Sequence, residues 1–269
     1  MKDFLTIEGH RIHYCTQGNG PAILLLHGFL ESMEIWDEFA LSLSSEFTVV
    51  RMDFPGHGKS DNFAEVHTMD FMAACAKAVL DYLNISHCII VGHSMGGYVS
   101  LAFAENYPSF VKGIVLFHSH AAPDTNEARE NRKRTINIVR QNRSGFICQF
   151  IPDLFDLRNI EKFAPQIENL TRIASEVPDA GIIAALDGMK ERKGWLGLLT
   201  ATDLPVLFIV GKQDSRIPYS VVMIQSLLPK HSEVLLLENV GHMGFIEAPE
   251  KTLQTLRHFA MKCFEKIRQ

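Results

Sequence analysis

The hydrophobic positions of this chain fall into short continuous runs that are separated by segments with helical spacing. Six runs rich in Val, Ile and Leu lie within residues 22–28, 47–58, 87–94, 111–120, 204–214 and 233–242. Continuous apolar runs are typical of parallel strands that are covered on both faces. Helical spacing fills most of the gaps, as in residues 68–84 and in residues 94–108, where Pro108 ends the segment. The alternation predicts an α/β fold with a mostly parallel, doubly wound sheet.

Two regions depart from this alternation. The opening "FLTIEGHRIHYCTQG" alternates apolar and polar residues in two halves around Gly9-His10, which predicts an N-terminal antiparallel hairpin. Residues 121–199 contain no strong strand and are too long for a plain connection. We therefore expect a core made of residues 1–120 and 200–269, with residues 121–199 inserted as a helical cap.

Four of the predicted parallel strands end in groups that can take part in chemistry. These groups are His27-Gly28, Ser94, Asp214 and His242. Ligands of open parallel sheets bind outside the carboxyl ends of the strands. We therefore expect these groups, which are distant in the sequence, to meet at one edge of the sheet.

Residues 92–96, "GHSMG", fit the pattern G-x-S-x-G between a strand and a helix. In such a turn the serine occupies a strained backbone, and small flanking residues let the strand and the helix approach. The N–H groups at the start of the following helix point toward an anion formed near Ser94. A glycine-rich turn with an incidental serine is the alternative, and the strand–turn–helix context argues against it.

A serine hydroxyl is a weak nucleophile and needs a neighbouring base. His242 follows the last predicted strand, where a loop can bring it onto Ser94. His118 and His120, at the end of the fourth parallel strand, are its rivals. Three other histidines near these motifs are interpreted as structural: His93 packs, His27 orients its loop by a hydrogen bond, and His57 belongs to a turn.

The base needs an acid that holds its tautomer and stabilises its charged form. Asp214, at the end of "VLFIVGKQD", is placed for this role, and Asp124, shortly after the fourth parallel strand, is the alternative. The order Ser94, Asp214, His242 is the triad order of α/β-hydrolases.

Five motifs together carry a resemblance to a known family. They are "HGF" (27–29), "DFPGHGKSD" (53–61), "GHSMGG" (92–97), "GKQD" (211–214) and "GHMGFIEAPE" (241–250). With them the chain resembles an α/β-hydrolase over nearly all of its length outside residues 121–199. The resemblance implies an oxyanion hole made by the backbone N–H groups of Phe29 and Met95. A serine at the elbow differs from the aspartate of haloalkane dehalogenases and epoxide hydrolases, and it indicates esterases, lactonases and their relatives.

The expected activity is that of a serine hydrolase with a Ser-His-Asp triad. It would cleave a small or medium carboxylic ester, thioester or lactone through an acyl-enzyme on Ser94. The same residues are compatible with carbon–carbon bond hydrolysis, acyl transfer or cofactor-free perhydrolysis. A ligand-binding receptor that turns over slowly is the alternative of a different class. The sequence leaves the natural substrate and the oligomeric state open.

Composition narrows the partners and the compartment. A net charge of −5 and a pI near 6.2 argue against a nucleic-acid partner. No signal peptide is recognised, and the longest aliphatic run, Ala22 to Leu26, is too short to span a bilayer. Five scattered cysteines make a disulfide framework and a zinc site improbable, so a cytoplasmic location is expected. No G-x-G-x-x-G opens a helix after the first parallel strand and no metal-ligand spacing stands out, so we expect no cofactor and no metal.

The predicted cap has two features. Residues 129–143 carry six basic residues against the single acid Glu130, and a solvated helix face is the favoured interpretation, with attraction of a carboxylate-bearing substrate as the alternative. The basic residues are Arg129, Arg132, Lys133, Arg134, Arg140 and Arg143. The second feature is the apolar "FICQFIPDLF" (146–155), with Trp195 further on. Most of these residues should form the core of the cap, and a few should roof an apolar pocket.

Overall fold

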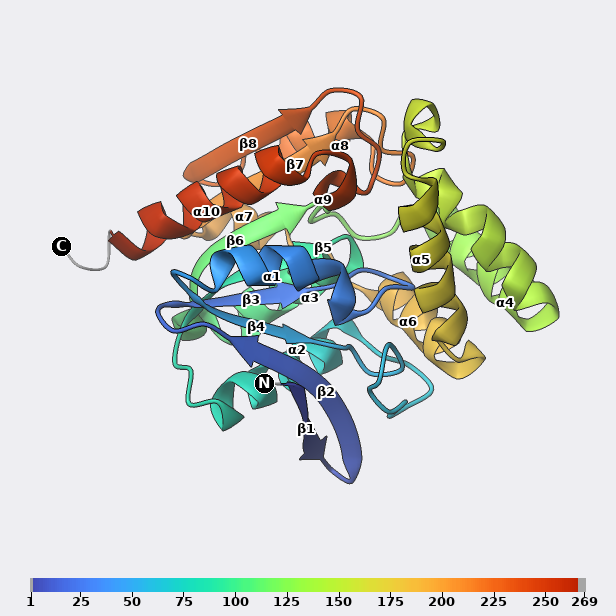
Figure 1. Ribbon diagram of the computed structural model, residues 1–269, viewed down its shortest axis with the longest axis horizontal. Helices are drawn as coiled ribbons and strands as arrows, with labels where there is room; N and C mark the ends of the chain where they lie inside the picture. Colours follow the sequence, from blue (N-terminus) through green and yellow to red (C-terminus); the bar gives the residue numbers. More distant parts are fainter. Residues whose placement is uncertain (1, 266–269) are drawn as a thin grey trace.

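An eight-stranded sheet crosses the molecule in the computed structural model, which describes residues 2–265 (Figure 1). The spatial order of the strands is β1-β2-β4-β3-β5-β6-β7-β8. From β4 to β8 all neighbours are parallel, whereas β1 and β2 are antiparallel additions at one edge. The strands are β1 (Lys2–Ile7), β2 (His10–Gln17), β3 (Ala22–Leu26), β4 (Thr48–Met52), β5 (Cys88–His93), β6 (Val111–Phe117), β7 (Pro205–Gly211) and β8 (His231–Leu237).

The strand predictions are confirmed. Each of the six apolar runs coincides with one parallel strand, although β8 begins two residues before its run at 233–242, and β3 and β5 are buried along their whole length. The predicted hairpin is formed by β1 and β2, which join at Glu8 and Gly9 with φ values of 49° and 86°. The sheet is therefore mostly parallel with an N-terminal antiparallel pair, as the pattern predicted.

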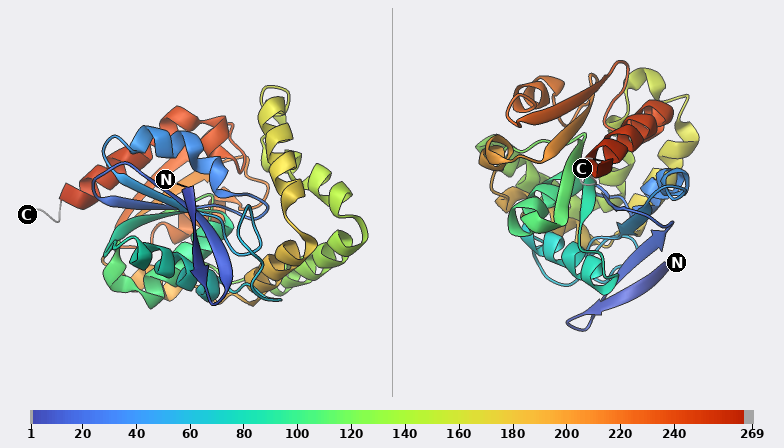
Figure 2. Two further views of the ribbon diagram at one scale, coloured as in Figure 1. Left: turned by 60° about the horizontal axis from the view of Figure 1, so that its bottom comes forward. Right: turned by 90° about the vertical axis from the view of Figure 1, so that its left-hand side faces the viewer.

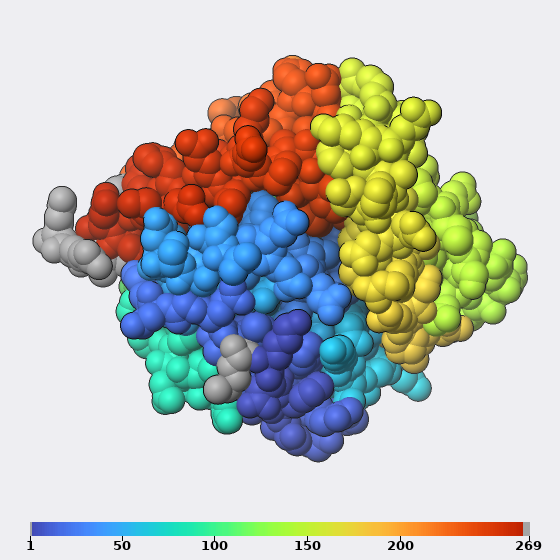
Figure 3. All heavy atoms as spheres, in the orientation of Figure 1, coloured from blue at the N-terminus to red at the C-terminus, as the bar shows by residue number. Residues whose placement is uncertain are grey.

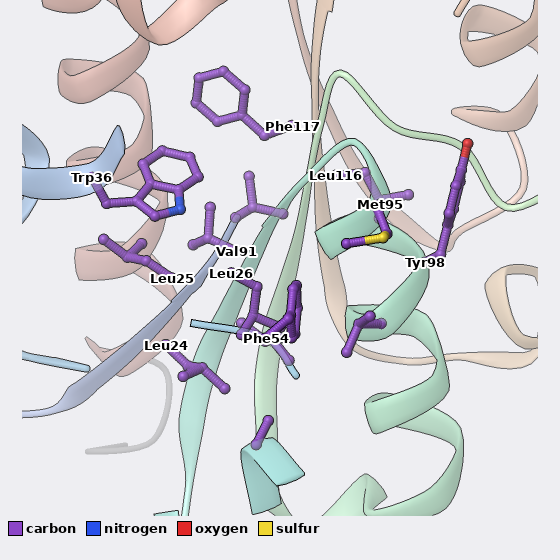
Figure 4. Packing of buried hydrophobic residues seen from close by; sticks show 14 of the residues in the cluster. Leu24, Leu25, Leu26, Trp36, Phe54, Val91, Met95, Tyr98, Leu116 and Phe117 are labelled. Carbon is purple, nitrogen blue, oxygen red and sulfur yellow. The ribbon is translucent and has the colours of Figure 1, made fainter. Parts of the chain in front are cut away.

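Helices cover both faces of the sheet. In the left view of Figure 2, α1 and α10 lie on one face and α2 and α3 lie on the other. Figure 4 shows the buried centre, where Trp36 and Phe117 make an edge-to-face contact at 5.5 Å and Met95 extends from α3. The helices of this part are α1 (Asp37–Leu43), α2 (Met69–Tyr82), α3 (Met95–Asn106), α7 (Leu196–Ala201), α8 (Tyr219–Gln225), α9 (Gly244–Glu247) and α10 (Pro249–Glu265), and the short 3₁₀ turns are η1 (Met33–Trp36) and η2 (Pro108–Phe110).

The segment between β6 and β7 is helical. Its elements are α4 (Asn126–Phe150), η3 (Pro152–Leu154), η4 (Leu157–Asn159), α5 (Ala164–Glu176) and α6 (Asp179–Glu191). The Thr125 side chain accepts a hydrogen bond from the Ala128 N–H and so caps α4, which is interrupted at Asn142 (φ −154°, ψ 71°). These helices gather as one lobe against the rest of the molecule (Figure 3). The division of the chain into core and cap at residues 121 and 199 stays a prediction.

None of the helices within residues 2–265 is both long enough and apolar enough to cross a membrane.

Candidate active site

Ser94 occupies a strained turn between β5 and α3. Its φ of 50° and ψ of −114° lie in a region that residues other than glycine seldom adopt. A Cβ atom at Gly92 would lie 2.1 Å from the Gly96 carbonyl oxygen, and one at Gly96 would lie 2.6 Å from the Leu26 carbonyl oxygen. The two glycines therefore let strand and helix approach closely enough to present the serine, as the G-x-S-x-G pattern requires.

Asp214 lies just after β7 and binds His242 through one of its oxygens. Asp214 Oδ2 accepts a hydrogen bond from His242 Nδ1 at 2.8 Å, and Oδ1 accepts the backbone N–H groups of Arg216 and Ile217 at 2.8 and 2.9 Å. Burial opposes ionisation, but the His242 imidazole and the hydrogen bonds hold the pKa of Asp214 well below its usual range. The carboxylate is thus charged and holds a proton on His242 Nδ1.

His242 and Ser94 line the same cavity, which has a volume of about 250 Å³. With Nδ1 on the Asp214 side, the remaining ring nitrogen of His242 is the one available to a partner in that cavity. Phe29 also lines it, whereas Met95 is fully buried as the first residue of α3. The N–H of Met95 belongs to the unpaired donors at the start of a helix. The N–H of Phe29 has no acceptor among residues 2–265. The structure thus brings together the regions that carry the predicted site residues.

His118 is a second histidine on the same carboxylate. Its Nδ1 lies 3.0 Å from Asp214 Oδ2, while its buried Nε2 has no hydrogen-bond partner within the described part of the chain. Burial, opposed by the bond to Asp214, lowers the pKa of His118 to about 4, so the ring is neutral near pH 7. His118 does not line the cavity, and His120 instead contacts the Tyr98 hydroxyl at 3.3 Å. Neither His118 nor His120 combines a hydrogen bond to Asp214 with a place in the lining of the cavity, as His242 does.

Asp124, the alternative acid, binds arginines. Its oxygens accept hydrogen bonds from Arg132 Nε and from Arg192, both at 2.5 Å. Burial opposes ionisation, but these two guanidinium groups hold the pKa of Asp124 below its usual range. No histidine is hydrogen-bonded to this carboxylate among residues 2–265, so it has no base to orient.

Glu31 and His93 form a buried pair that sequence reasoning missed. Glu31 Oε2 accepts the Gly28 N–H at 2.5 Å and lies 3.0 Å from His93 Nδ1, while His93 Nε2 lies 2.9 Å from the His242 carbonyl oxygen. Both acceptors are satisfied when His93 carries two protons. Burial opposes this charge, yet Glu31 raises the pKa of His93. His93 therefore links three loops of the site by hydrogen bonds, rather than only packing. The signal available in the sequence was an acid two residues after the "HGF" motif.

His27 orients its loop as predicted. Its Nδ1 donates to the Gly28 carbonyl oxygen at 2.7 Å, and its Nε2 accepts the Phe54 N–H at 3.0 Å. The neutral ring that this pattern needs agrees with a pKa lowered mainly by burial.

Among the described residues, His118, Asp214 and His242 are the group whose ligand atoms lie close enough together for a metal ion, all within 4.8 Å. Both histidine Nδ1 atoms already face Asp214 Oδ2 at hydrogen-bond distance. The arrangement suits two hydrogen bonds to one carboxylate, and the absence of a metal cofactor stays a prediction.

The side of the cavity that is formed by the segment between β6 and β7, the predicted cap, is mainly apolar. Phe146, Phe150 and Leu154, all from "FICQFIPDLF", line it, as do Leu186 and Met189 of α6. Trp195 does not line the cavity: it is buried elsewhere, and its Nε1 donates to Glu105 of α3 at 2.9 Å.

The basic run is largely a solvated face, in agreement with the favoured interpretation. Arg132 is its member that lines the cavity. Arg143 is half-buried and lies 3.2 Å from Asp179. The other four, Arg129, Lys133, Arg134 and Arg140, are exposed.

Comparison with known proteins agrees with this fold. The model of the alpha/beta hydrolase fold family matches residues 21–249. The chain belongs to this family. Among solved alpha/beta hydrolases, a thermophilic esterase from Thermogutta terrifontis, with malate bound, is similar at 30% identity and a TM-score of 0.92, over 98% of this chain and 99% of that one.

Two characterised relatives are hydrolases with named substrates. The (E)-2-((N-methylformamido)methylene)succinate hydrolase of Acinetobacter baylyi is 25% identical over 91% of this chain and 92% of its own length. The 2-(acetamidomethylene)succinate hydrolase of Mesorhizobium japonicum is 25% identical over 90% of this chain and 89% of its own length. Family and relatives together support hydrolase activity.

Proposed function

We propose that this alpha/beta hydrolase is a serine hydrolase that cleaves a small or medium carboxylic ester, thioester or lactone. Ser94 Oγ attacks the acyl carbon while His242 takes its proton, and Asp214 stabilises the resulting imidazolium. The backbone N–H groups of Phe29 and Met95 donate hydrogen bonds to the oxyanion. Removing a single donor of this kind in other enzymes lowers turnover by about 10²–10³-fold.

The bond from the acyl carbon to the leaving group then breaks, the leaving group receives the proton held by His242, and the acyl-enzyme on Ser94 is formed. Neutral His242 next deprotonates a water molecule, which attacks the acyl carbon. The bond from the acyl carbon to Ser94 Oγ breaks, His242 returns the proton to Ser94, and the carboxylic acid is released.

One observation carries this proposal: His242, whose Nδ1 donates to Asp214 Oδ2 at 2.8 Å, lines the same cavity as a serine held on a strained elbow. The similar esterase from Thermogutta terrifontis supports an ester as the substrate. The volume of about 250 Å³ favours small acyl groups, since it lies just below the common range for ligand pockets, about 300–1,000 Å³.

The second candidate is hydrolysis of a bond other than an ester by the same residues. It is favoured by the two relatives that act on substituted methylenesuccinates, both of which are named for substrates other than simple esters. A substrate panel with esters, thioesters, lactones, diketones and enamides at equal concentration separates the two candidates.

The test of the proposal is active-site labelling combined with turnover. A fluorophosphonate should label the wild-type protein and not Ser94→Ala, while Ser86→Ala, at an exposed serine, should label as wild type does. With p-nitrophenyl acetate and butyrate we expect steady release of nitrophenol. A single stoichiometric burst would indicate a slow receptor or another acyl acceptor. Labelling that persists in Ser94→Ala would reject the proposal.

A further inference from the structure

Two guanidinium groups line the cavity beside Ser94, and they differ in what they already bind. Arg132, from α4, donates from Nε and Nη2 to Asp124 at 2.5 and 3.3 Å, and its Nη1 lies 3.4 Å from Met189 Sδ. Its side chain is thus engaged by a carboxylate in a forked geometry.

Arg216, from the loop after β7, makes no side-chain hydrogen bond within the described part of the chain. Its nearest carboxylate oxygen, Asp153 Oδ2, lies 3.6 Å away, beyond hydrogen-bond distance, and the Asp153 side chain is 55% exposed. Among residues 2–265 no acceptor lies within hydrogen-bond distance of the Arg216 guanidinium. An ion pair so open to water contributes little.

The position of the Arg216 guanidinium is nevertheless defined. Its carbon lies 4.4 Å from the centre of the Phe150 ring, and that ring also lines the cavity. Its backbone N–H is held by Asp214, the same carboxylate that orients His242. The backbone of Arg216 is therefore held by the acid that orients His242, and its cation is supported by an aromatic face.

Asp153 does not line the cavity, so within the described residues it leaves the cavity side of this cation without a carboxylate that is free to bind it. Glu31 is the acid that lines the cavity within the described chain, and it is already bound by the Gly28 N–H and by His93. Partial burial of Arg216 lowers its pKa, which indicates incomplete hydration of the charge. A carboxylate offers two oxygens that match the guanidinium fork.

We propose that Arg216 binds a carboxylate of the substrate, so that the natural substrate is an acyl compound carrying a carboxylate, such as the half-ester of a short dicarboxylic acid. The inference rests on the proposed function, which supplies the bond that is cleaved. It adds the carboxylate by which Arg216 would select the substrate. Arg216 is thus a specificity-determining residue, whereas Arg132 holds Asp124 and the cap.

The kinetic test uses two esters that differ only in charge. Ethyl hydrogen succinate carries a carboxylate where ethyl succinamate carries a carboxamide, and ethanol release reports kcat/KM for each. Wild type should prefer the charged ester, and Arg216→Gln should lower the ratio of the two kcat/KM values by about 10–100-fold, mostly through KM. Arg134→Gln removes the same charge from an exposed position and should leave the ratio unchanged. A wild type without the preference, or a ratio that Arg216→Gln leaves unchanged, would overturn the proposal.

A binding experiment keeps this inference separate from the reaction. Succinate is titrated calorimetrically into Ser94→Ala and into Ser94→Ala/Arg216→Gln at fixed ionic strength. We expect binding in the first and at least tenfold weaker binding in the second. This result would support the carboxylate site even if fluorophosphonate labelling rejected Ser94 as the nucleophile. Equal affinity in the two variants, or no binding to either, would reject the site even if Ser94 were labelled.

Discussion

The two walls of the cavity are held in different ways. On the core wall, Ser94 is positioned by a strained turn, and His242 by a hydrogen bond of 2.8 Å to Asp214. Asp214 does not itself line the cavity and is held just after β7 by two backbone N–H groups at 2.8 and 2.9 Å. On the cap wall, Phe146, Leu186 and their neighbours are positioned by apolar packing between α4 and α6.

This difference separates chemistry from selectivity. Hydrogen bonds and strained turns define the positions of the reacting atoms closely. Replacing one hydrogen-bonding group leaves its buried partner without a hydrogen bond. Apolar packing accepts substitutions of similar volume at lower cost. The cap wall can therefore change substrate preference while the core wall keeps the reacting groups in place.

The largest effect is expected from Asp214, the acid that holds His242 of the core wall. Asp214→Asn should lower kcat for p-nitrophenyl butyrate by about 10⁴-fold, because an amide favours the wrong tautomer of His242 while keeping the geometry. Asp124→Asn should lower stability instead, since it leaves Arg132 and the buried Arg192 without their carboxylate. Turnover and urea unfolding of both variants provide the measurement. A greater loss of kcat in Asp124→Asn than in Asp214→Asn would show that Asp124 is the catalytic acid.

The cap wall should control acyl-chain length. Wild type is expected to hydrolyse butyrate esters faster than palmitate esters, because the cavity holds only about 250 Å³. Leu186→Ala enlarges it and should shift the palmitate-to-butyrate ratio of kcat/KM upward by roughly tenfold, the order of the 1–3 kcal/mol by which apolar pockets discriminate substrates differing by a methylene.

Leu170→Ala is the matched control for that experiment. Leu170 is a buried leucine of α5 that does not line the cavity, so its loss should lower stability by about 2–5 kcal/mol without changing the ratio. Faster palmitate hydrolysis by wild type would contradict the idea that these helices restrict the pocket.

The smallest effect concerns the free energy of unfolding in acid, which depends on the buried His57. Burial, and then repulsion from His27, lowers the pKa of the fully buried His57 to about 3, against 6.5 in a model peptide. Between these values the unfolded chain binds a proton that the folded chain does not. The free energy of unfolding should therefore fall as pH falls below 6.5, by up to about 1.4 kcal/mol per pH unit from this residue.

His57→Gln should make that decline shallower, whereas His87→Gln, at an exposed position, should not. Urea unfolding at pH 7, 6 and 5 gives the three slopes. Equal slopes for wild type and His57→Gln would show that His57 binds protons alike in the folded and the unfolded chain, which contradicts the lowered pKa.

Most of the fold and the core wall could be predicted because their signals are local. Continuous apolar runs mark the strands, glycines on either side of Ser94 mark the elbow, and Asp214 and His242 stand directly after strands or in the loop that follows. Parallel strands bring their carboxyl ends to one edge, so position along the strand was enough to predict proximity. The sequence could not decide between His118 and His242 as the base, because both follow a strand. In the structure His118 also contacts Asp214, at 3.0 Å, but it does not line the cavity.

The sequence by itself determined the family, the sheet and the positions from which Ser94, Asp214 and His242 approach one another, since each depends on short-range pattern and on the geometry of parallel strands. Tertiary structure alone decided which charges are paired. Glu31 meets His93 across 62 positions and Arg192 meets Asp124 across 68, so neither pairing has a local signal. It likewise decided that Arg132 is bound to Asp124 and that Arg216 has no side-chain hydrogen bond within residues 2–265. The physical reason is that a charged side chain binds whichever partner folding brings within reach. The amino-acid pattern does not encode the distance between residues so far apart in the chain.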